Sequence, residues 1–195
     1  MKNIFITQRV GTISEELRDS LDSRWLQFME NCNLIPILIP NNEKILKHYL
    51  SIIECDGIIL SGGDNIYSLG GPKCRDDIET FLINLSISKN IPLIGICRGM
   101  QKIQDFFGIK LTRVQGNIQE NQEIYIDGEK HNVNSYHEYG TKINNENFNI
   151  WAIGKNNIIK GISHNSHKIS GVMWHPERIV PNREYDINLF REFFG

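Results

Sequence analysis

Four short runs of aliphatic residues in the first half of the chain are the feature that most restricts its fold. Segments between them carry apolar residues every three or four positions, which is the spacing of one face of an amphipathic helix. Short apolar strands that alternate with such helices are typical of a parallel sheet covered on both faces. The predicted strands are NIFIT (3–7), LIPILI (34–39), DGIILS (56–61) and IPLIGI (91–96).

Three helices are predicted between these strands. The first begins at Thr12 and Glu15, whose spacing is that of a capping box, and its apolar face runs from residue 17 to residue 32. The other two span residues 42–53 and 76–88. Together, the strands and helices predict an α/β fold with a doubly wound, mostly parallel sheet.

After Gly108 the pattern changes to extended segments joined by polar turns, and a last helix, EYDINLFREFF, is predicted over 184–194. Successive extended segments of this kind favour a mixed or antiparallel extension of the sheet. The 195 residues are expected to form a single domain, 1–195. The extended segments are 110–114, 122–126, 131–135, 148–153 and 168–174.

Composition excludes several classes of function. The net charge of -2 leaves no basic footprint for nucleic acid, and no run approaches the roughly 18 apolar residues of a membrane span. The four cysteines lack the spacing of a disulfide framework or zinc site, and His164 and His167 are interpreted as part of a polar loop. We therefore expect a cytoplasmic protein without metal or cofactor.

Cys97 follows the fourth predicted strand and stands between two glycines, in GICRG (95–99). Ligands bind at the carboxyl ends of strands in open α/β sheets. The flanking glycines allow a sharp strand-to-helix turn, a nucleophile elbow, which is expected to hold the thiol up in solvent. The helix N-terminus favours the thiolate. Cys97 is therefore the candidate nucleophile, and the Arg98 N–H is a candidate oxyanion donor.

A candidate base lies in GVMWHPER (171–178). Pro176 favours an extended backbone at His175, so that the side chains of His175 and Glu177 point to the same side of the chain. The carboxylate can then orient one imidazole nitrogen while the other faces the thiol.

Two adjacent glycines, Gly62 and Gly63, follow the third predicted strand. They can present backbone N–H groups to an anion, and so provide a second oxyanion donor. Taken singly, each signal also has a structural interpretation: a cysteine buried in a turn, a surface His-x-Glu, or a tight loop. Their combination at the strand ends of one sheet indicates a cysteine hydrolase. The other cysteines, Cys32, Cys55 and Cys74, have no such setting and are interpreted as structural.

The sequence resembles the class I glutamine amidotransferases, and among them the free-standing gamma-glutamyl hydrolases. The resemblance implies a flavodoxin-like fold, a Cys97–His175–Glu177 triad, and an oxyanion hole formed by the N–H groups of Gly63 and Arg98. It implies hydrolysis of a gamma-glutamyl amide through a glutamyl thioester, without a cofactor. The matching segments, in family order, are DGIILSGGD, IPLIGICRGMQ, VNSYHE and GVMWHPER.

The resemblance also implies where the glutamyl group binds. The chain departs from the family in a compact loop after Gly63 and in Glu138-Tyr139, which replaces the more usual His-Gln. Both departures lie on the leaving-group side. The implied glutamyl-binding residues are Gly62, Gln101, Ser135, Tyr136 and His137.

The leaving group and the partner stay open at this stage. One candidate leaving group is a cytidine diphosphoramidate used for capsule modification, and several basic residues could bind its diphosphate. The alternatives are a glutaminase subunit that supplies ammonia to a separate synthetase, and a non-catalytic binding module on the same fold. The expected partner is a small gamma-glutamyl compound, with a homodimer or a partner synthetase also considered. The basic residues are Lys73, Arg75, Lys130, Arg178 and Arg183.

Overall fold

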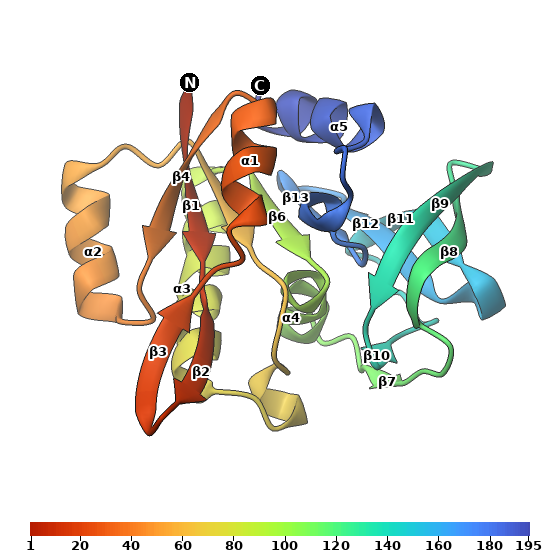
Figure 1. Ribbon diagram of the computed structural model, residues 1–195, viewed down its shortest axis with the longest axis horizontal. Coiled ribbons are helices and arrows are strands. Elements are labelled where there is room, and N and C mark those ends of the chain that lie inside the picture. Colours follow the sequence, from red (N-terminus) through yellow and green to blue (C-terminus); the bar gives the residue numbers. More distant parts are fainter.

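A computed structural model describes residues 1–195 (Figure 1). Its main sheet has nine strands in the order β4-β1-β5-β6-β13-β12-β11-β8-β9. The first five in this order are parallel, and they are β4 (Leu34–Ile39), β1 (Lys2–Thr7), β5 (Gly57–Leu60), β6 (Leu93–Ile96) and β13 (Ile169–Val172). This order is that of flavodoxin-like folds, as predicted.

The other four strands of the sheet pair antiparallel and extend it beyond β13 (Figure 1). Of the five extended segments that were predicted, 122–126, 131–135 and 148–153 lie in these antiparallel strands. Segment 168–174 contains β13, which pairs parallel with β6 and antiparallel with the next strand, so the extension is mixed. Segment 110–114 contains a short strand, Thr112–Arg113, that pairs with Tyr139–Gly140 in a separate sheet, and the strand at 159–164 was not predicted. The four strands are β12 (Ile159–His164), β11 (Phe148–Gly154), β8 (Ile118–Ile126) and β9 (Glu129–Tyr136).

Helices cover both faces of the parallel strands (Figure 1). Side chains alternate across a strand, so Ile4 and Ile6 of β1 pack in one apolar core, and Phe5 packs in the other. The first core includes side chains of α1 and α5, and the second includes side chains of α2, α3 and α4. The helices are α1 (Arg24–Asn31), α2 (Glu43–Ile52), α3 (Lys73–Lys89), α4 (Arg98–Phe106) and α5 (Glu184–Phe194). No helix is long and apolar enough to cross a membrane.

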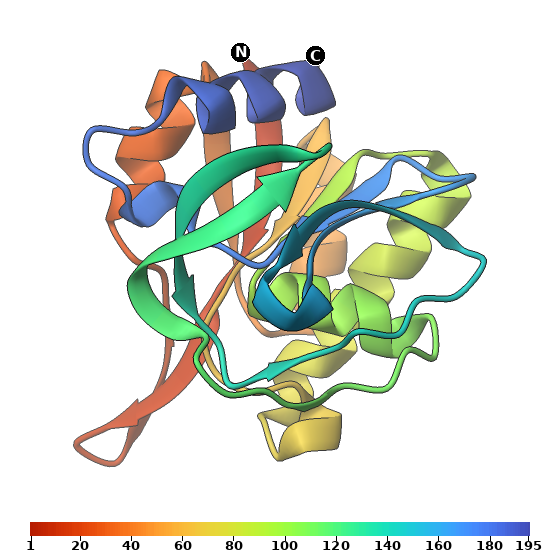
Figure 2. The same ribbon diagram turned by 90° about the vertical axis from the view of Figure 1, so that its right-hand side faces the viewer.

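The helix predicted to start at Thr12 is wrong in its first half. Residues 9–20 form a hairpin of β2 (Arg9–Ile13) and β3 (Glu16–Ser20), which projects from the body in Figure 2. Its turn residues, Ser14 and Glu15, have positive φ angles of 50° and 67°. The spacing of Thr12 and Glu15 therefore belongs to a strand and a tight turn, not to the start of a helix. Leu17, expected on the buried face, is 73% exposed.

Close packing of α4 against the sheet depends on two glycines. A Cβ on Gly99 would lie 2.0 Å from the carbonyl oxygen of Leu60, in β5. A Cβ on Gly95 would lie 2.4 Å from the carbonyl carbon of Gly99. Because neither position tolerates a side chain, the first turn of α4 can lie directly against β5 and β6, with Cys97 at the junction.

We expect Gly99→Ala to lower the free energy of unfolding by about 1–3 kcal/mol, because the added methyl group meets backbone atoms that cannot move aside easily. Urea unfolding monitored by circular dichroism measures the change. Gly11→Ala is the matched control, since nothing lies within 4 Å of a Cβ at that position. Equal midpoints for the two variants would contradict the close packing.

Candidate active site

Cys97 has the backbone geometry of a nucleophile elbow. Its φ and ψ angles are 52° and -102°, an unusual conformation for a residue other than glycine, and it joins β6 directly to α4. Its N–H donates to the carbonyl oxygen of Val172, 2.7 Å away in the neighbouring strand. The sequence predicts a thiol exposed to solvent, and this prediction is wrong. Cys97 is only 5% exposed.

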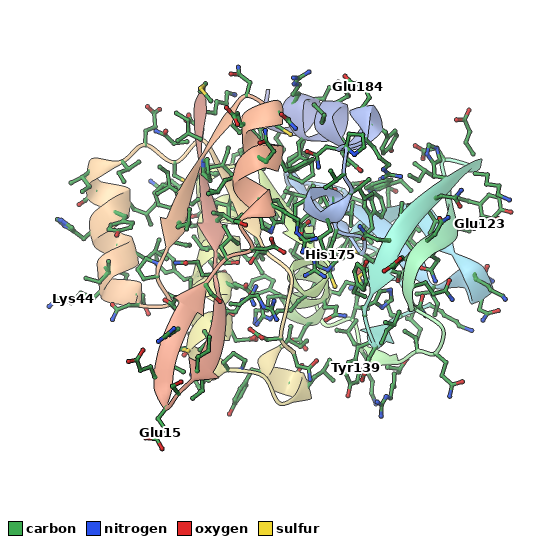
Figure 3. All side chains as sticks on the ribbon, viewed as in Figure 1. Glu15, Lys44, Glu123, Tyr139, His175 and Glu184 are labelled. Atoms are coloured by element: carbon green, nitrogen blue, oxygen red, sulfur yellow. The ribbon has the colours of Figure 1, made fainter.

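A pocket of about 320 Å³ adjoins Cys97. Its walls come from the loop after β5, the first turn of α4, the segment that follows β9, and the segment after β13. His175 lies near the middle of the molecule in Figure 3, where the parallel and antiparallel parts of the sheet meet. The predicted site residues that line this pocket are Gly63, Cys97, Arg98, Gln101, Tyr136, His137 and His175.

His175 is fixed from three sides. Its Nδ1 lies 2.7 Å from Oε1 of Glu177, which follows it in a 3-10 turn, Pro176–Arg178. Its backbone N–H and C=O both bind the side-chain amide of Asn134, each at 2.8 Å. Gly62 packs on the ring, because a Cβ there would lie 2.4 Å from the ring carbon Cε1. Gly62 and Glu177 thus lie behind His175 rather than in the pocket.

The electrostatics of Cys97 and His175 favour an ion pair. Burial alone would raise the pKa of the thiol, but the charge of His175 and a hydrogen bond to its ring lower the pKa of Cys97 below its usual value. Burial alone would lower the pKa of His175, but the charge of Cys97 and hydrogen bonds to Cys97 and Glu177 raise it to about 9. The shift of each pKa therefore favours the charged pair, thiolate and imidazolium, over the neutral pair.

The predicted oxyanion donors lie at the same pocket. Arg98 is the first residue of α4, where a backbone N–H has no partner within the helix. Gly63 has a φ of +87°, which favours glycine, and a Cβ there would lie 2.3 Å from the Nε atom of Arg9. A second reason for glycine at this position is therefore the approach of the Arg9 side chain.

The predicted glutamyl-binding residues divide into two groups. The side chain of Gln101 lines the pocket and donates to the carbonyl oxygen of Tyr139 at 2.8 Å. Tyr136 also lines the pocket, with its ring centroid 5.9 Å from that of His175. Ser135 points elsewhere: its hydroxyl donates to the carbonyl oxygen of Asn117 at 2.7 Å, and the residue is buried.

Lys160 was missed by the sequence interpretation. Its ammonium is buried, 2.6 Å from Nε2 of His137, 2.9 Å from Oδ1 of Asn117 and 3.2 Å from the hydroxyl of Ser135. Burial lowers the pKa of Lys160 to about 7. Burial and the charge of Lys160 lower the pKa of His137 to about 3, so His137 is neutral. A lone lysine in the apolar run IIKGI was the available signal.

Of the basic residues considered for a diphosphate, only Arg178 lines the pocket. Its guanidinium lies 5.1 Å from the ring centroid of Tyr136. Arg9, which was not considered, also lines the pocket. The other residues are paired elsewhere: Lys73 with Asp77, Arg75 with Glu79, Lys130 with Glu123 and Arg183 with Asp186.

Comparison with known proteins identifies the family of this chain. The sequence profile of the family described as glutamine amidotransferase class-I matches residues 16–194, and the chain belongs to this family. A gamma-glutamyl-CDP-amidate hydrolase of Campylobacter jejuni is 29% identical over 98% of this chain and 97% of its own length.

Two further relatives extend the comparison. A GMP synthase (glutamine-hydrolyzing) of Prochlorococcus marinus is 34% identical over 83% of this chain, which spans only 30% of the length of that enzyme. The crystal structure of a glutamine amidotransferase from Thermotoga maritima superposes with a TM-score of 0.69 at 15% identity, covering 98% of this chain and 83% of that one. The last comparison concerns the fold alone.

We expect iodoacetamide at pH 7 to alkylate Cys97 faster than the thiols of buried Cys32 and half-buried Cys55. Burial raises the pKa of Cys32 to about 12 and that of Cys55 to about 11, so both stay protonated, whereas at Cys97 the charge of His175 outweighs burial and lowers the pKa. Mass spectrometry of peptides over a pH series measures each rate. His175→Asn should shift the Cys97 profile to higher pH, because burial is then opposed only by the weaker effect of the Arg178 charge. An unshifted profile in that variant would contradict the ion pair.

Proposed function

We propose that this protein hydrolyses a gamma-glutamyl amide and releases L-glutamate. The observation that carries the proposal is the buried Cys97–His175 pair, which adjoins a pocket that Gly63 and Arg98 also line. A polarised thiolate beside two N–H donors is suited to acyl transfer.

The reaction proceeds in two steps. The Cys97 thiolate attacks the gamma-carbonyl carbon, and the negative oxygen that forms accepts hydrogen bonds from the N–H groups of Gly63 and Arg98. Protonated His175 gives its proton to the leaving nitrogen as the C–N bond breaks, which leaves a glutamyl thioester on Cys97. Neutral His175 then takes a proton from water, and the hydroxide releases glutamate from the thioester.

Glu177 orients and stabilises the imidazolium in this scheme. It lies 2.7 Å from Nδ1, which leaves the other ring nitrogen, Nε2, for the thiol and the leaving nitrogen. Both residues are 2% exposed, so their interaction is little weakened by water.

The leaving group is proposed to be anionic, with a cytidine diphosphoramidate as the first candidate. The Campylobacter jejuni relative, which covers nearly the whole chain, is a gamma-glutamyl-CDP-amidate hydrolase. The guanidinium groups of Arg9 and Arg178 line the pocket, and the ring of Tyr136 next to Arg178 offers a face for stacking. These side chains supply charge and an aromatic surface to the pocket.

A second candidate function is that of a glutaminase subunit that supplies ammonia to a separate synthetase. It is favoured by the similarity to a GMP synthase, of which this chain spans only 30%. The two functions differ in their requirement for a partner, because a stand-alone hydrolase is active by itself. A module that binds without catalysis is the remaining alternative, and it predicts no glutamate release under any condition.

We expect the purified protein to release glutamate from gamma-glutamyl-CDP-amidate faster than from L-glutamine, gamma-glutamyl-aminobutyrate or a poly-gamma-glutamyl folate. Coupled glutamate dehydrogenase measures release, and Cys97→Ala should abolish it. Release that survives in Cys97→Ala would exclude the proposed nucleophile. Release from glutamine only after addition of a synthetase would favour the second candidate function.

Arg178→Gln should lower the ratio of kcat/KM for gamma-glutamyl-CDP-amidate to that for L-glutamine by about tenfold, the size of one lost charge-assisted hydrogen bond. Taking the ratio removes any effect of Arg178 on the thiol, which is common to both substrates. Arg18→Gln, an exposed change on β3, is the control and should leave the ratio unaltered. An unchanged ratio in Arg178→Gln would place the leaving group elsewhere.

A further inference from the structure

Arg75, on α3, is a fully buried arginine that binds the loop after β5. Its Nη2 donates to the carbonyl oxygens of Ser61 at 2.6 Å and Gly62 at 3.1 Å, and its Nη1 donates to that of Gly63 at 2.9 Å. Its Nε donates to Oε1 of Glu79 at 3.0 Å. One guanidinium therefore gathers three consecutive carbonyl groups on a single side of the loop.

This contact determines where the N–H of Gly63 points. The carbonyl of Gly62 and the N–H of Gly63 belong to the same planar trans peptide unit, in which the two groups point in opposite directions. Because the carbonyl of Gly62 faces Arg75, the N–H of Gly63 must face away from Arg75. Gly63 also lines the pocket beside Cys97, whereas Arg75 does not.

The second oxyanion donor is tied to the same network. The side chain of Arg98 binds Oε2 of Glu79, and it also binds Oδ1 of Asp76 at 2.6 Å. Glu79 therefore bridges the two arginines, with one carboxylate oxygen on each. Burial would raise the pKa of Glu79, but the charges of Arg98 and Arg75 lower it, so the bridge is ionised.

We propose that Arg75 and Glu79 are positioning residues that hold the two oxyanion donors in a fixed arrangement. Arg75 orients the Gly62–Gly63 peptide unit, and Glu79 links Arg75 to the side chain of Arg98. This proposal rests on the proposed function, because it assigns the Gly63 and Arg98 N–H groups to the negative oxygen of the first step. Neither residue touches the substrate.

The planar guanidinium group of Arg75 is required to orient the Gly62–Gly63 peptide unit. Its five N–H donors lie in one plane, and here they are directed at three carbonyls, the carboxylates of Glu79 and Asp64, and the hydroxyl of Ser61. A lysine at the same position keeps the charge opposite Glu79, but its single ammonium cannot bind all three carbonyls. Arg75→Lys thus separates the charge of the residue from its ability to orient the loop.

The test compares Arg75→Lys with the wild type in glutamate release from gamma-glutamyl-CDP-amidate and from L-glutamine. We expect kcat to fall about 10²–10³-fold, the effect of losing one oxyanion donor, while KM changes less than about threefold. The pH profile of Cys97 alkylation by iodoacetamide should not move, because Arg75 is not among the charges that act on the thiol. Parallel losses in kcat and in alkylation would instead indicate a general structural role and overturn the proposal.

Two further measurements separate a positioning effect from a loss of stability, and one of them needs no substrate. Leu46→Ala, in the core under α2, is the control for lost stability, and it should lower the melting temperature without a comparable loss of kcat. Hydrogen exchange of a peptide containing residues 61–65 should be at least tenfold faster in Arg75→Lys, relative to the wild type, and unchanged in Leu46→Ala. If Arg75→Lys does not fold, Glu79→Gln provides the same comparison through the other end of the bridge.

The outcomes separate the two proposals. Failure of the wild type to release glutamate from either compound rejects the proposed function, and hydrogen exchange then decides alone whether Arg75 orients the loop. An active wild type with unaltered kcat in Arg75→Lys rejects the positioning role and leaves the proposed function standing.

Discussion

The adjacency of β6 and β13 is the constraint on which the site depends. These two strands pair in parallel, with Ile96 opposite Val172, so their carboxyl ends reach the same edge of the sheet. Cys97 follows one strand at once, and His175 follows the other after two residues. Cys97 and His175 are 78 residues apart in the sequence, but they are neighbours in space. In a buried setting each then stabilises the charged form of the other, against the cost of removing it from water.

Buried charge recurs near this pair, and in the network around Glu79 it is compensated by opposite charge. Arg75, Arg98 and Glu79 form one continuous network, in which every charge has an opposite partner. Removing one partner of such a network is far more costly than removing a surface pair, because the remaining charge stays buried. The same interactions that stabilise the network hold the loop after β5 and the first turn of α4. Stability and the arrangement of the proposed oxyanion donors therefore depend on the same side chains.

Prediction from the sequence succeeded where the local pattern had one physical interpretation. Apolar runs bounded by turns identified four of the five parallel strands, because strands of a sheet covered on both faces are mostly apolar throughout. The hairpin at residues 9–20 was misassigned, because the spacing of Thr12 and Glu15 is compatible with a helix start and equally with a strand and a tight turn. Lys160 gave almost no signal, since its three polar contacts come from residues distant in the sequence.

The sequence by itself determined the alternation of strands and helices in most of the first half of the chain, the candidate nucleophile and the candidate base. GICRG and WHPE specify these locally, because glycines control the turn around Cys97 and Pro176 controls the backbone at His175. Only the tertiary structure decided that the thiol is buried, that Arg75 binds backbone rather than a ligand, and that Arg9 and Arg178 share the pocket of Cys97. Burial and charge pairing depend on long-range contacts, and a linear pattern does not contain them.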